Sequence, residues 1–206
     1  MKERPILFSD PMIRALLAGT KTQTRRAIKT HRSDDSFVCV DYGDGWWPYR
    51  SEDGESDVMS DGCEYPYNCP YGVPGDRLWV RERHALENRY RNVWCRYAAD
   101  DAYVAVPAPM LVSVAKPGWR PSIHMPRWAS RITLEITDVR VERLQDISEE
   151  DAKAEGTEPF RLPVHPARES LRHVDGYSQL WDSINGEGSW DLNPWVWALT
   201  FRRVHG

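Results

Sequence analysis

Near the N-terminus a short amphipathic helix signal runs directly into a polar strand, and this junction constrains the fold more than any other stretch. Ser9 or Asp10 can cap the helix, and Gly19 can take the left-handed conformation that ends it. The residues that follow alternate as in a strand, so that Thr22 and Thr24 share one face. The chain therefore has to pass from helix to strand within a few residues.

The junction also carries a set of groups that are able to do chemistry. A threonine hydroxyl is a poor nucleophile until a base takes its proton, and a lysine acts as that base only if burial or positive neighbours lower its pKa. Arg25 and Arg26 are such neighbours and would attract an anionic substrate. Lys21 lies on the turn and escapes the strand alternation, so its amine can swing towards Thr24. The alternative is that the threonines favour a strand and the basic residues are merely solvated.

The pattern Gly19-x-Lys21-Thr22-x-Thr24-x-Arg26, placed after a short N-terminal helix, resembles the signature of the ASCH-domain family. The resemblance implies a small β-barrel related to the PUA RNA-binding fold. The best-characterised bacterial members are amidohydrolases that deacetylate N4-acetylcytidine, with a lysine, a threonine and a glutamate as functional residues. By this resemblance Lys21 and Thr24 are catalytic, and Arg26 holds the nucleoside or its phosphate.

The catalytic glutamate is expected on a second helix, between Ile147 and Gly156. Ser148 can cap this helix and Gly156 can end it. In the family the functional glutamate lies on the helix at this place, which implies that Glu155 takes the role. Glu158 is its nearest rival.

Alternating apolar residues predict further strands over 77–82, 132–139 and 195–201, the last of which is expected to close the barrel. In the first of them Trp79 lies between two arginines, on the face opposite Leu78. Trp79 is a candidate to stack on the substrate, and a place at the rim of the barrel is the alternative. The segment 5–8 is predicted to be a buried strand, and Tyr177 and Trp181 are predicted to be core residues of a third helix over 177–184.

Two segments, about 30–68 and 84–118, are extra material relative to the family pattern. Residues 34–61 carry nine acidic side chains against Arg50, a net charge of −8, so the rest of the chain carries −4 − (−8) = +4. A mildly basic body suits a nucleoside or a short RNA segment better than broad duplex binding. The acidic segment is either a solvated insertion or a lid. In the other segment, 84–118, a short hairpin is predicted around 92–98.

A second concentration of polar and aromatic side chains lies at 119–131, where three arginines, one histidine and two tryptophans are interleaved. Such interleaving is typical of a nucleotide or nucleic-acid surface. His124, Arg127 and Trp128 are therefore candidate substrate-binding residues. The run also resembles one in the longer, phage- and prophage-borne ASCH proteins, whereas the alternative is a loop that leads into the next strand.

The length and composition favour a single cytoplasmic domain over 1–206. The sequence has no stretch of 18 apolar residues and no signal peptide, so no membrane association is expected. The four cysteines are expected to be free thiols, and the spacing of Cys63 and Cys69 is not that of a zinc knuckle. We expect no metal, no cofactor and no obligate protein partner.

Together these features predict an α+β protein, a small PUA-like ASCH barrel with short flanking helices and two long insertions. The predicted function is an amidohydrolase acting on an N4-acylated cytidine or a related modified pyrimidine nucleoside, through Lys21, Thr24 and Glu155. Two alternatives stay open. One is an RNA-binding PUA-like module without turnover, and the other is an ASCH-type ribonuclease supported by a metal ion.

Overall fold

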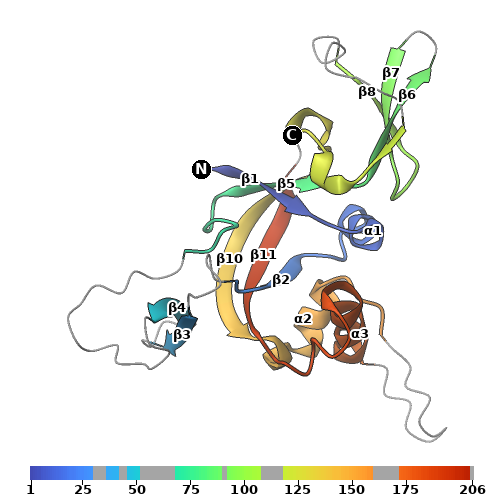
Figure 1. Ribbon diagram of the computed structural model, residues 1–206. Coiled ribbons are helices and arrows are strands. Elements are labelled where there is room, and N and C mark those ends of the chain that lie inside the picture. The colour runs from blue at the N-terminus through green and yellow to red at the C-terminus, as the bar shows by residue number, and fades with distance from the viewer. Residues whose placement is uncertain are drawn as a thin grey trace, which may run out of the picture.

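The structure is a computed structural model that describes residues 1–29, 36–41, 46–51, 68–89, 92–107, 118–159 and 172–204. These residues form an α+β fold with three β-sheets and three α-helices (Figure 1). The largest, called the main sheet, has five strands in the order β1 (Glu3–Leu7), β5 (Arg77–Arg81), β10 (Thr133–Arg143), β11 (Trp195–Val204) and β2 (Gln23–Ala27).

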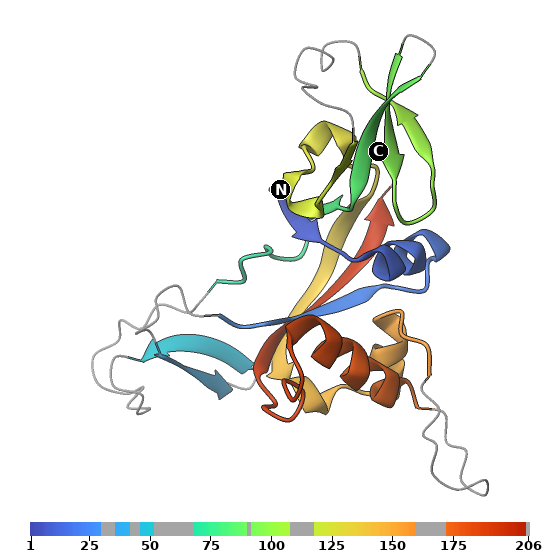
Figure 2. The ribbon, with the colours of Figure 1, turned by 45° about the vertical axis from the view of Figure 1, so that its right-hand side comes forward.

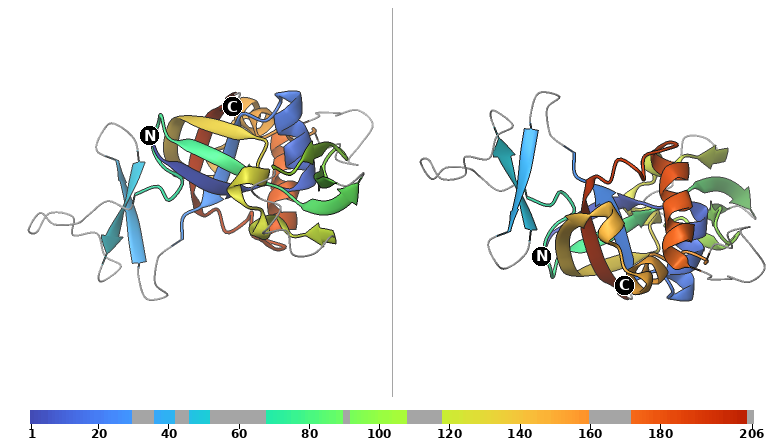
Figure 3. Two further views of the ribbon diagram at one scale, coloured as in Figure 1. Left: turned by 90° about the horizontal axis from the view of Figure 1, so that it is seen from above. Right: turned by 90° about the horizontal axis from the view of Figure 1, so that it is seen from below.

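The main sheet is open, so the predicted closed barrel is not present in the described residues. β1 pairs in parallel with β5, and every other neighbouring pair is antiparallel. β1 and β2 are the two edges, and among the described strands no ladder joins them. The strand predicted over 195–201 is β11, which pairs with β10 and β2 but closes no barrel among the described strands, because the sheet stays open between β1 and β2. Figure 3 shows β10, β5 and β1 side by side from above.

α1 (Asp10–Ala18) covers the inner face of the main sheet with its apolar stripe. Ile13 and Leu16 are buried against Ile6, Leu78 and other strand residues. Gly19 ends the helix at φ 77°, as the sequence predicted. The segment 5–8 is buried on one face only: Ile6 and Phe8 are buried, whereas Leu7 is exposed because alternation along the strand turns it to the outer face.

A second sheet is built by the segment that was expected to be an insertion with one hairpin. Its four antiparallel strands lie in the order β8 (Tyr103–Ala105), β7 (Asn92–Tyr97), β6 (His84–Arg89) and β9 (Gly118–Arg120). The sheet has its own core, which also contains Met125 and Ala129 from the segment with two short 3-10 helices, η2 (Ser122–His124) and η3 (Arg127–Ala129). Figures 1 and 2 show this sheet at the end of the molecule away from α2 and α3.

In the acidic segment the structure describes one hairpin, formed by β3 (Ser36–Asp41) and β4 (Trp46–Ser51). It stands to one side of the main sheet in Figures 1 and 3. The rest of the acidic stretch 34–61 and the cysteine at position 63 lie outside the described residues.

The last two helices pack together at the other end of the main sheet. β10 runs through η4 (Leu144–Asp146) into α2 (Glu149–Ala154), and α3 (His173–Asn185) follows. The predicted cap is confirmed, since the Asp151 backbone N–H donates to Ser148 Oγ at 3.0 Å. Gly156 ends α2 at φ 78°, and Glu155 forms an isolated β-bridge with Lys21. The turn after α1 and the end of α2 therefore lie side by side.

Alanine at Gly156 is expected to cost more stability than alanine at Gly188, although both glycines have nearly the same φ, 78° and 77°. A Cβ at position 156 would lie 2.8 Å from Cβ of Ala15 and 3.0 Å from Cβ of Lys21, whereas one at 188 meets nothing within 4 Å. Both variants carry left-handed strain, and crowding adds about 1–3 kcal/mol at 156. Urea unfolding of the two variants measures the difference, and equal losses would contradict the close approach.

Candidate functional site

A cavity of about 360 Å³ lies around the edge strand β2 and is bordered by α3 and by residues 68–71. This volume is in the range of small-molecule sites. The lining mixes charged, aromatic and aliphatic side chains, among them Met12, Thr24, Arg25, Arg26, Tyr71, Glu155, Tyr177, Leu180, Trp181, Ile184 and Trp197.

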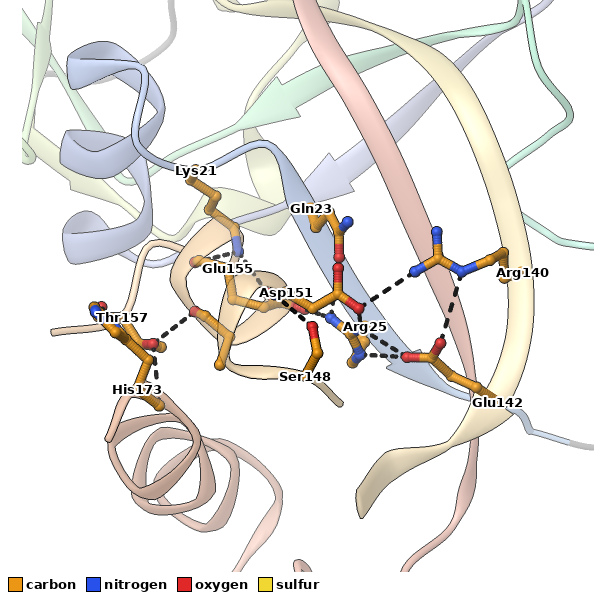
Figure 4. A network of polar contacts seen from close by, with 11 residues as sticks. Lys21, Gln23, Arg25, Arg140, Glu142, Ser148, Asp151, Glu155, Thr157 and His173 are labelled. Atoms are coloured by element: carbon orange, nitrogen blue, oxygen red, sulfur yellow. Dashed lines mark hydrogen bonds and ion pairs between the residues drawn. The ribbon is translucent and has the colours of Figure 1, made fainter. Parts of the chain in front are cut away.

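Beside the cavity Lys21 and Glu155 form a buried ion pair, which brings together two of the three predicted catalytic residues (Figure 4). Lys21 Nζ donates to Glu155 Oε2 at 2.7 Å and to the Glu155 backbone carbonyl at 2.8 Å. The two side chains are 0% and 1% exposed. Burial lowers the pKa of Lys21, against the opposing attraction of Glu155. The rival Glu158 is exposed.

Arg25 connects this pair to a wider network of carboxylates, a role that the sequence did not indicate. Its guanidinium lies 2.7 Å from Glu142, 3.0 Å from Asp151 and 3.4 Å from Glu155. Arg140 continues the network towards the surface, 3.5 Å from Asp151 (Figure 4). Burial opposes the charge on Arg25, but Glu142 and Glu155 outweigh it and raise the pKa of the guanidinium.

Thr24 and Arg26 occupy the face of β2 opposite Arg25 and line the cavity. Thr24 is buried and lies across from Leu199 on β11. The Lys21 amine is hydrogen-bonded to Glu155 rather than to the Thr24 hydroxyl. Arg26 Nη2 donates to the Leu7 carbonyl at 2.6 Å, and within the described part of the chain its buried Nε has no partner.

Tyr177 is a site residue that the sequence analysis assigned to the core alone. It is buried, lines the cavity and lies next to Glu155. Burial, followed by the Glu155 charge, raises the pKa of its phenol well above the ordinary value. Trp181, Leu180 and Ile184 from the same helix also line the cavity. The helical spacing of these residues in the sequence could have indicated that one apolar face of α3 contributes both to the core and to the cavity lining.

The other four predicted substrate-binding residues do not line this cavity. Trp79 is buried on the outer face of the main sheet, and Arg127 lies near its ring and is paired with Glu3 at 3.0 Å. His124 is exposed in η2, and Trp128 packs against the core of the second sheet. The physical reason is that β9 pairs with β6, which carries the segment 119–131 away from β2 and α2.

The described residues contain no group of three or more His, Cys, Asp or Glu side chains placed to hold a metal ion. Cys39, Cys69 and Cys95 are free thiols, and burial raises the pKa of Cys39 to about 12 and that of Cys95 to about 11. Among the described helices, none has the length and apolar character needed to span a membrane.

Comparison of the chain with family models, with curated proteins and with solved structures finds no match. What the site can do therefore follows from its own groups. Thr24 and the Glu155 carboxylate line one cavity of mixed polar and apolar character, and the carboxylate is in direct contact with the Lys21 amine, whose pKa is lowered. This is a set suited to proton transfer and nucleophilic attack at a carbonyl carbon.

Proposed function

We propose that this protein is a hydrolase that removes the acyl group from an N4-acylated cytidine or a related modified pyrimidine nucleoside, as the ASCH-family resemblance implies. The observation that carries the proposal is the buried 2.7 Å contact between Lys21 and Glu155 beside a cavity lined by Thr24. In this proposal the main sheet corresponds to the family's PUA-like barrel, with the seam between β1 and β2 open and bridged by the Arg26 hydrogen bond to Leu7.

The first step uses the proton that Lys21 and Glu155 share. In this proposal the buried pair reacts as a neutral amine and a carboxylic acid, with the shared proton on Glu155. Lys21 takes the Thr24 proton as the hydroxyl oxygen attacks the acyl carbon. Glu155 gives its proton to the N4 nitrogen, the amide C–N bond breaks, and cytidine leaves with the acyl group held on Thr24 as an ester.

The second step restores the enzyme. Water attacks the ester carbon and gives a proton to the Glu155 carboxylate, and Lys21 returns a proton to the Thr24 oxygen as the carboxylic acid leaves. The pair is then again a neutral amine and a carboxylic acid, so the cycle balances without another reactant. Arg26 and the aromatic side chains Tyr71, Tyr177 and Trp181 would hold the sugar or its phosphate and the base.

The purified protein is expected to release cytidine from N4-acetylcytidine, measured by chromatography of the nucleosides. An N4-alkylated cytidine, which has no acyl carbonyl, is the matched control and is expected to stay intact. No release above the protein-free rate would overturn the proposal. Cleavage of a labelled RNA that EDTA abolishes would identify the ribonuclease alternative instead.

A further inference from the structure

The outer face of the second sheet carries a row of side chains that crosses all its strands. The strand register places Ala85 of β6 between Trp119 of β9 and Arg96 of β7, and Arg96 opposite Tyr103 of β8. Side chains directly opposite one another in antiparallel strands lie on the same face. Trp119, Arg96 and Tyr103 therefore form one row, with the small Ala85 between the first two.

Arginine and aromatic groups contact one another along this row. The Arg96 guanidinium carbon lies 5.4 Å from the Trp119 ring centroid and 5.8 Å from that of Tyr103. The Arg83 guanidinium carbon also lies 5.4 Å from the Trp119 ring centroid. Trp119 is nonetheless 51% exposed. The row thus presents aromatic and guanidinium groups at the surface, and Trp119 is the most exposed of them.

The opposite face of the same sheet is already used. Leu86, Cys95 and Tyr97 point to that side and are buried with Met125 and Ala129 in the core of the second sheet. The Tyr97 hydroxyl donates to the Ala129 carbonyl at 2.8 Å. The core of the second sheet is therefore formed on this face, and Trp119 on the outer face is not part of it.

The charge of this part of the chain differs from that of the rest. Residues 83–131 carry eight Lys and Arg against three Asp and Glu, a net +5, whereas the whole chain carries −4 and the remainder therefore −9. Within the row, Glu87 and Asp101 pair with Arg96 and offset its charge. The segment as a whole thus attracts a polyanion, while the row itself offers stacking.

We propose that the outer face of the second sheet binds single-stranded nucleic acid, with unpaired bases stacked on Trp119 and on the Arg96–Tyr103 pair and with Arg83 next to a phosphate. A single strand exposes the base faces that such a platform needs, whereas a duplex buries them. The site lies at the end of the molecule away from α2 and α3 (Figures 1 and 2) and is distinct from the cavity at Lys21 and Glu155. It goes beyond the proposed deacylation and does not depend on it.

Fluorescence anisotropy with a labelled RNA of about 12 nucleotides, the same sequence as DNA, and the RNA duplex tests this proposal. We expect the single strands to bind more tightly than the duplex, with affinity that falls as salt rises. Trp119→Ala is expected to weaken single-strand binding about tenfold or more, and Trp119→Phe to keep most of it, because a ring remains to stack. Equal affinity for RNA and DNA would assign recognition to stacking alone, and tighter RNA binding would add a contact to the 2′-hydroxyl.

Two exposed arginines provide a matched comparison for the charge. Arg83 is 59% exposed and Arg202 is 67% exposed, and each is paired with a carboxylate at 2.8 Å, Arg83 with Asp10 and Arg202 with Glu135. Arg83→Ala is expected to weaken binding and reduce the salt slope by about 1, whereas Arg202→Ala on the main sheet should change neither. No binding at low salt, tighter duplex binding, or an unchanged affinity of a folded Trp119→Ala variant would each overturn the proposal. Glu155→Gln is expected to bind like the wild type whether or not the protein deacylates nucleosides.

Discussion

Glu155→Gln is expected to lower kcat for the release of cytidine about 10³-fold and to change KM little. The glutamine keeps the shape of the side chain and an oxygen that accepts the Lys21 hydrogen bond, which is 2.7 Å long in the wild type. It cannot give a proton to the leaving nitrogen or take one from water. Initial rates over a range of N4-acetylcytidine concentrations measure both constants.

Glu158→Gln is the matched control, since Glu158 lies three positions further on, is exposed, and is the carboxylate that the sequence left as the rival. This variant is expected to be as active as the wild type. Thermal unfolding followed by circular dichroism checks that both variants are folded. Activity retained by Glu155→Gln and lost by Glu158→Gln would move the acid to the other residue.

The wild-type rate is expected to fall on the alkaline side with an apparent pKa below 10.5, the ordinary value of a lysine. Burial disfavours the ammonium form and so lowers the pKa of Lys21. In the proposed cycle the active pair holds one shared proton, and its loss at high pH removes the acid that the leaving nitrogen needs. A profile of kcat/KM against pH measures this, and a limb at or above 10.5 would contradict the lysine assignment.

The local parts of the site were predictable because their signals are short in sequence. Gly19 ends α1 and Ser148 caps α2 where the pattern predicted, since a helix end depends on its immediate neighbours. The contact between Lys21 and Glu155 spans 134 positions, and the sequence indicated it only through a family resemblance. The structure confirms that contact.

Other parts were not predictable from local pattern. Arg25 contacts Glu142, Asp151 and Glu155, which lie 117, 126 and 130 positions away in the sequence. The order of charged residues along a sequence does not determine which of them form ion pairs. The second sheet depends on the pairing of β6 with the three-residue β9, and such pairing is decided by tertiary packing rather than by propensity. This is why the segment 119–131 was placed at the substrate cavity and lies elsewhere.

Arg25→Met is expected to lower the free energy of unfolding by about 3–5 kcal/mol, a large share of the stability of a domain of this size. The Arg25 side chain is fully buried and lies within 3.4 Å of the Glu142, Asp151 and Glu155 carboxylates. Methionine fills a similar volume but carries no charge, so the three carboxylates lose the cation between them. Urea unfolding of the variant and the wild type measures the loss.

Arg140→Met is the matched control, because Arg140 contacts two of the same carboxylates, Glu142 at 3.7 Å and Asp151 at 3.5 Å, but is 41% exposed. Water screens these contacts, so the expected loss is about 1 kcal/mol or less. Similar losses in the two variants would mean that Arg25 contributes as an ordinary surface charge. A large loss at Arg25 alone would mean that the buried guanidinium compensates the charge of the carboxylates around it.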